Sequence, residues 1–126
     1  NVWSAIGATA LLSYENSGHN NNLSFIITKE GVVVMHASDN YLLAKTLHEE
    51  IEKITDHHVK YVVIENAQGH AILGSNYWQE QGAKIVVNWL AVEVIEDHGE
   101  DILKQMQIGR RDKSLGTKLV EPDIIF

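Results

Sequence analysis

The chain has 126 residues, a hydrophobic content of 44% and no cysteine. This is enough for one domain, residues 1–126, with its own core, and it excludes disulfides and thiolate metal sites. The net charge of −7 argues against nucleic-acid binding, which depends on clustered basic residues. No apolar run approaches the roughly eighteen residues that span a bilayer, so we expect no membrane anchor.

Two short β-branched segments begin the expected fold. Residues 23–28 and 32–36 are rich in Val and Ile, and they are joined by Lys29-Glu30-Gly31. A glycine in so short a connection is typical of a hairpin turn. We therefore predict two antiparallel strands here.

A helix and a buried strand follow the hairpin. Leucines and isoleucines recur at helical spacing with acidic residues between them, which predicts a helix over about residues 39–55. Ser38 or Asp39 can accept hydrogen bonds from its first turn. Residues 59–64 are β-branched and predict a strand, which completes a β-α-β unit with a parallel strand.

The rest of the chain continues this alternation. Its apolar spacing predicts a helix over 72–81, a strand over 84–87, a helix from 90 to 106 and a last strand over 124–126. Gly82 ends the first of these helices and Gly99 bends or splits the second. We expect the basic run from Arg110 to Lys113 to be a solvated loop.

Polar side chains gather where the strand over 59–64 ends. The carboxyl edge of the sheet is the usual place for ligands in α/β proteins. The candidate site there consists of Glu65, Asn66, Gln68 and His70, with His36 at the end of the neighbouring strand. The structural alternative is that His70 hydrogen-bonds the loop backbone and His36 caps its strand.

The loop resembles a known motif. The segment Asn66-Ala-Gln-Gly-His-Ala-Ile-Leu-Gly74 is similar to the metal-binding loop of the metallo-β-lactamase fold, His-x-His-x-Asp-His followed by an apolar pair and glycine. Residues 20–36 resemble the opening hairpin of that family, 77–87 its next helix and strand, and 116–126 the end of its first half. The most similar branch is the sulfur-oxidation and quinoprotein-associated hydrolase-like one.

The resemblance implies an α/β fold and a degenerate metal site. The metallo-β-lactamase fold is an αββα sandwich of two similar halves, and this chain matches only the first, a mixed sheet covered by helices on one face. The two leading histidines of the motif fall on Asn66 and Gln68, the aspartate on His70 and the last histidine on Ala71, while His36 replaces the strand-ending aspartate. Amide side chains cannot hold zinc at useful affinity. We therefore expect no zinc and a vestigial pocket.

A lone first half implies a partner. One sheet face, lined by residues such as Phe25, Ile27, Val33 and Met35, would lack the sheet that normally covers it. Large exposed apolar patches are unusual on monomers. We therefore expect a homodimer, which is the commonest oligomer, or a complementary half-chain.

Three functions remain open. The first is a catalytically degenerate metallo-β-lactamase-like protein that serves as a binding or assembly module and is not an enzyme. The second is a metal-dependent hydrolase with a rearranged or partner-completed site, using His36 and His70 with Glu65 or Asp39. The third is the regulatory or structural half of a split enzyme.

The compartment also stays open. The first residue is Asn1 and not methionine, which is compatible with a fragment. It is equally compatible with a cytoplasmic protein or with one exported after removal of an upstream segment.

Overall fold

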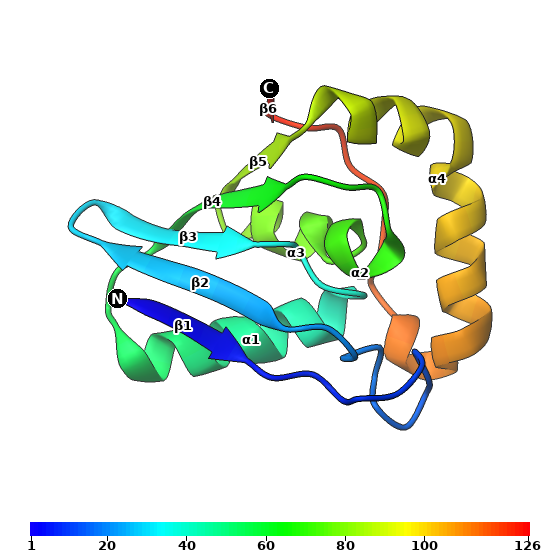
Figure 1. Ribbon diagram of the computed structural model, residues 1–126, viewed down its shortest axis with the longest axis horizontal. Coiled ribbons are helices and arrows are strands. Elements are labelled where there is room, and N and C mark those ends of the chain that lie inside the picture. Colours follow the sequence, from blue (N-terminus) through cyan, green and yellow to red (C-terminus); the bar gives the residue numbers. More distant parts are fainter.

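Six strands form one mixed sheet in the computed structural model, which describes residues 1–126 (Figure 1). The strands lie side by side in chain order. They are β1 (Val2–Ala5), β2 (Leu23–Thr28), β3 (Gly31–Met35), β4 (Val59–Ile64), β5 (Lys84–Val87) and β6 (Ile124–Ile125). The pairs β1–β2 and β2–β3 are antiparallel, and the pairs from β3 to β6 are parallel. The predicted hairpin and β-α-β unit are confirmed.

Four α-helices connect and flank these strands. They are α1 (Tyr41–Ile54), α2 (Gly69–Ile72), α3 (Ser75–Glu80) and α4 (Trp89–Arg110), and a 3-10 turn, η1 (Arg111–Ser114), follows α4. No helix is both long enough and apolar enough to cross a membrane. Helix α4 is continuous between its ends and changes direction partway along (Figure 1). Gly99 is buried in it, and an added Cβ would lie 3.2 Å from Leu119.

The prediction for the start of α1 was wrong. The cap is Asn40, whose side chain accepts a hydrogen bond from the backbone N–H of Leu43 at 2.8 Å. Ser38 and Asp39 are fully buried just before it and bind other groups.

The single helix predicted over 72–81 was also wrong, because the structure has the two short helices α2 and α3 there. Gly74 interrupts them and donates its backbone N–H to Ser38 O at 2.9 Å. A Cβ at Gly74 would lie 2.0 Å from Ala37 O, so only glycine fits this close backbone approach.

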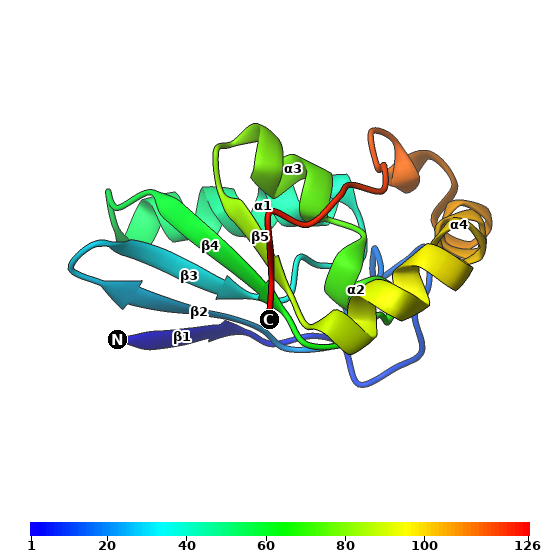
Figure 2. The same ribbon diagram turned by 90° about the horizontal axis from the view of Figure 1, so that it is seen from above.

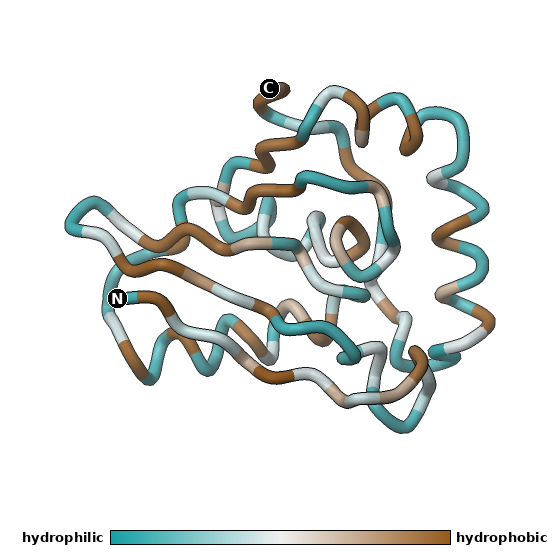
Figure 3. Tube along the Cα trace, in the orientation of Figure 1, coloured by the Kyte–Doolittle hydropathy of each residue, from teal (hydrophilic) through white to brown (hydrophobic).

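The core lies between the sheet and the helices on one of its faces. Figure 2 shows α1 and α3 over the same side of the strands, and the brown, hydrophobic segments of Figure 3 follow the strands. Val32, Val34 and Val62 are fully buried in this layer. Trp78 of α3 is also fully buried and donates its indole N–H to Ala37 O at 3.1 Å. The fold is therefore a mixed sheet with helices on one face, as the sequence resemblance implied.

The opposite side of the sheet, called the open face below, carries no helix (Figure 2). Residues paired across strands share a face, and the register aligns two rows there. One row is Val2, Ile26, Val33, Tyr61 and Lys84. The other is Ser4, Ser24, Met35, Val63, Val86 and Ile124. The open face is therefore mostly apolar.

Two residues of the predicted open face were placed on the wrong side. Phe25 pairs with Val34 and is 3% exposed, and Ile27 pairs with the fully buried Val32, so both belong to the helix-covered face. Successive side chains of a strand point to opposite faces of the sheet. Phe25 therefore shares a face with its partner Val34, and not with Val33. Val33 and Met35 do lie on the open face.

Candidate functional site

The predicted site forms at the carboxyl ends of β3 and β4. Backbone pairing continues past Met35, because the N–H of His36 donates to Val63 O at 2.9 Å. His36 has a positive φ of 69°, which is uncommon for a residue other than glycine. Its Nε2 lies 2.9 Å from Oε1 of Glu65, the first residue after β4.

Asn66 braces both this pair and its own loop. Its Nδ2 donates to Glu65 Oε2 at 2.7 Å, and its Oδ1 accepts from the backbone N–H of Gln68 at 2.9 Å. The second contact is a side-chain turn of the kind that asparagine favours. Burial tends to raise the pKa of Glu65, but hydrogen bonds from His36 and Asn66 outweigh it and hold that pKa below its usual range. The carboxyl group is therefore an ionised acceptor in neutral solution.

His70 of α2 completes the cluster. Its ring centroid lies 5.9 Å from that of His36, with the rings edge to face. Burial, and secondly the neighbouring His36, lower the pKa of His70. The structure therefore brings His36, Glu65, Asn66 and His70 together. Gln68 stands apart, with an exposed side chain that lines a neighbouring cleft.

The donor set does not fit a zinc ion. The two leading ligand positions of the motif carry the amides of Asn66 and Gln68, and the fourth is Ala71, which has no donor. Zinc takes imidazole, thiolate or carboxylate ligands. In the structure, no group of three or more His, Cys, Asp or Glu side chains is placed to hold a metal ion. His36 and Glu65 instead bind each other.

A buried ion pair, which the sequence analysis did not predict, lies beside this cluster. The guanidinium of Arg110, at the end of α4, donates from Nε and Nη2 to the two carboxylate oxygens of Asp39, each at 2.9 Å. The Arg110 side chain is 7% exposed and the Asp39 side chain 1%. Asn40 Nδ2 also donates to Asp39 at 3.0 Å. The prediction that the basic run is a solvated loop was therefore wrong at its first residue.

One sequence signal could have identified Arg110. It follows Met106 by four residues, as Met106 follows Ile102, so it continues the buried stripe of α4. A basic residue at such a position needs a buried acid as partner. Asp39 lies in the loop before α1. Asn40, and not Asp39, is the N-cap of that helix, so the Asp39 carboxylate is available for Arg110.

Comparisons with known proteins bear on the fold. No protein-family model and no curated protein matches the sequence. Among solved structures, the chain is similar to a metallo-β-lactamase from Pontibacter korlensis, with 18% identity and a TM-score of 0.64 over 83% of this chain and 40% of that one. It is also similar to a metallo-β-lactamase from Hirschia baltica, with 10% identity and a TM-score of 0.63 over 83% of this chain and 39% of that one.

These similarities establish the class of fold. The chain has the metallo-β-lactamase fold over the part that it matches, and it spans about 40% of the length of those solved structures. At such low identity the similarity extends to the fold and not to the activity. The expected fold is thereby confirmed, whereas the superfamily, its branch and the role of each site residue stay predictions.

Proposed function

We propose that this protein is a catalytically degenerate metallo-β-lactamase-like assembly module, and that a second copy of the same chain covers its open face. The supporting observation is the pair of mostly apolar rows on that face, in which Ser4, Ser24 and Lys84 are the polar members. Among their residues, Ile26 is 36% exposed, Tyr61 41% and Ile124 44%. A contiguous patch of this kind is typical of an interaction surface.

A second copy suits the geometry of this surface. Two sheets pack face to face at about 10 Å with their strands about 30° apart. In a twofold pair the same patch serves both chains, so an apolar face meets an apolar face. The hydrogen-bonded hydroxyls of Ser4 and Ser24, 2.8 Å apart, form a polar boundary at one edge of it. The solved structures of similar fold have about 60% of their length outside the match, enough to include a second sheet layer.

The mass in solution tests self-association. Light scattering over a hundredfold range of protein concentration should give twice the chain mass of 14.1 kDa. Ile26→Lys should weaken the dimer at least about tenfold, because it removes the apolar burial of two isoleucines that are each 36% exposed, about 1–2 kcal/mol together, and places two charges in the interface. Leu42→Lys is the matched control, since Leu42 is 40% exposed on α1, on the other side of the sheet. A monomer at every concentration, or equal dissociation in both variants, would refute the proposal.

The donor chemistry supports a module without zinc or hydrolytic activity, and the net charge of −7 supports one that does not bind nucleic acid. The loop residues then act, on this proposal, as a vestigial ligand pocket. It is formed by His36, Glu65, Asn66, Gln68 and His70.

One observation favours a second candidate, a metal-dependent hydrolase whose site a partner chain completes. His36 contacts Glu65, and its ring centroid lies 5.9 Å from that of His70, so a partner chain would have to rearrange and complete this set of two imidazoles and a carboxylate. Equilibrium titration of the protein with zinc distinguishes the two functions. Stoichiometric binding that is lost in His70→Ala would favour the hydrolase. Weak binding that is unchanged in that variant would favour the module.

A further inference from the structure

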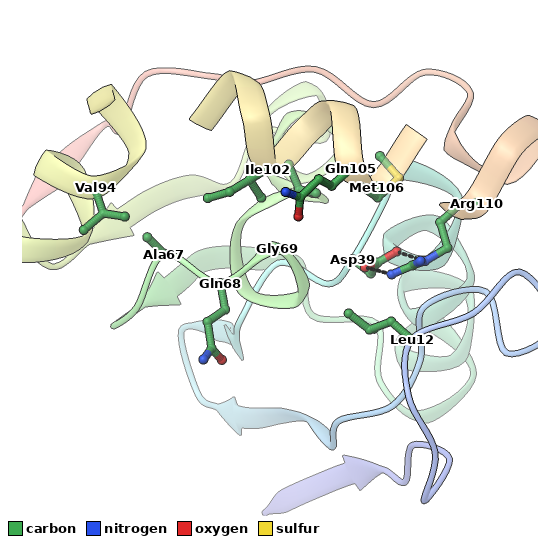
Figure 4. Close-up of a pocket in the computed structure, with 11 residues that line it drawn as sticks. Leu12, Asp39, Ala67, Gln68, Gly69, Val94, Ile102, Gln105, Met106 and Arg110 are labelled. Carbon is green, nitrogen blue, oxygen red and sulfur yellow. Dashed lines mark hydrogen bonds and ion pairs between the residues drawn. The ribbon is translucent and has the colours of Figure 1, made fainter. Parts of the chain in front are cut away.

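A cleft of about 560 Å³ lies between α4 and the loops that follow β1, β3 and β4 (Figure 4). This volume is within the range of about 300–1,000 Å³ that small-molecule pockets occupy. Of the five residues of the predicted vestigial pocket only Gln68 lines it, and Asp39, a candidate of the alternative metal set, lines it too. The walls are mainly apolar, formed by Leu12, Ala67, Leu73, Val94, Ile102 and Met106.

The buried ion pair closes one end of this cleft. Figure 4 shows Arg110 and Asp39 side by side there, joined by their two hydrogen bonds. The third guanidinium nitrogen, Nη1, donates to no protein group. The only buried side-chain polar atom without a partner is Oδ1 of Asn21, so Nη1 must be accessible to solvent. Arg110 lines the cleft, and Nη1 is the guanidinium nitrogen that the ion pair leaves free to donate.

The charges around the cleft indicate which kind of ligand group Nη1 of Arg110 would bind. Asp39 already neutralises the guanidinium, so the end of the cleft carries a strong donor but no net charge. The chain as a whole carries −7, which disfavours an anion. Gln105 and Gln68 are exposed amides of the lining that can also donate. A neutral carbonyl oxygen matches this arrangement better than a carboxylate or an ammonium group does.

We propose that this cleft binds a small neutral amphipathic molecule, with an apolar chain along the walls and a carbonyl acceptor at Arg110. Octanamide is a suitable probe, and octanoate and octylammonium have similar apolar chains with charged heads. Binding would be followed by 1H–15N NMR titration of the whole chain. The expected result is saturable binding of octanamide that shifts the side-chain amides of Gln68 and Gln105, with weaker binding of both charged probes.

Two variants of α4 make the test specific. Val94 lines the cleft, and Val94→Asp should weaken octanamide binding at least about fivefold, the equivalent of about 1 kcal/mol. Ile108→Asp is the matched control, because Ile108 is an exposed aliphatic residue of the same helix outside the cleft. Equal weakening in both variants, tighter binding of either charged probe, or no saturable binding of octanamide would overturn the proposal.

Discussion

The buried pair of Asp39 and Arg110 carries a prediction for stability. Arg110→Met removes both hydrogen bonds and leaves the Asp39 carboxylate, 1% exposed, with only the Asn40 amide. Removing one partner of such a pair costs about 3–5 kcal/mol, because an uncompensated charge stays buried. A domain of this size has a free energy of unfolding of about 5–15 kcal/mol. The variant should therefore lose a large fraction of its stability, with Tm lower by roughly 10 °C or more.

Urea unfolding followed by tryptophan fluorescence measures this loss. All proteins would be compared at one concentration, because self-association shifts apparent stability. Lys104→Met is the control, since it removes an exposed charge from the same helix. The double variant Asp39→Leu/Arg110→Met should regain most of the loss, because it leaves no unpaired charge. If Arg110→Met costs less than about 1 kcal/mol, or the double variant is worse than the single one, the pair does not have the assigned role.

Two further predictions concern a glycine and a histidine near this pair. Gly74→Ala should destabilise the fold by about 1–3 kcal/mol, since its Cβ would meet Ala37 O at 2.0 Å, whereas Gly109→Ala, with nothing within 4 Å, should stabilise α4 by up to about 1 kcal/mol. If the urea midpoints of Gly74→Ala and Gly109→Ala both rose or both fell relative to the unsubstituted protein, this prediction would be contradicted. His70 should titrate below its usual value of 6.5 by NMR, and His36→Asn should raise that pKa only in part, because burial is the larger cause. The contribution of neutral His70 to stability is then complete above pH 6.5 and is lost as the pH falls through the pKa of the folded state. A His70 pKa that returns fully to 6.5 in His36→Asn would contradict burial as the larger cause.

Local pattern was sufficient for most of the fold. The strands of the hairpin and of the β-α-β unit have β-branched sequences with buried faces, and their residues appear where the periodicity predicted them. Strand β1 was missed because three of its four residues are exposed, so it carries no burial pattern. The break between α2 and α3 was missed because its cause is the contact of Gly74 with the distant Ala37 and Ser38. Such a contact leaves no trace in local periodicity.

The same distinction applies to the site. His36 and Glu65 directly follow the adjacent parallel strands β3 and β4, so strand order alone predicts that they meet. In the structure His36 Nε2 lies 2.9 Å from Glu65 Oε1. Arg110 and Asp39 are 71 residues apart, and only the path of α4 across the end of the sheet brings them together. A pattern within one helix can mark Arg110 as buried, but it cannot identify the acid that the residue pairs with.

The open face and the cleft lie on different parts of the molecule, so assembly and ligand binding can be tested independently. The open face uses the side of the sheet away from α1 and α3 (Figure 2), whereas the cleft lies at the strand ends between α4 and the loops (Figure 4). Ile26 is in the first surface and Val94 in the second. A charge at Ile26 changes the surface that a second copy would cover and leaves the cleft walls intact. Failure of octanamide to bind would therefore leave the assembly proposal standing, and a monomeric chain would leave the cleft proposal standing.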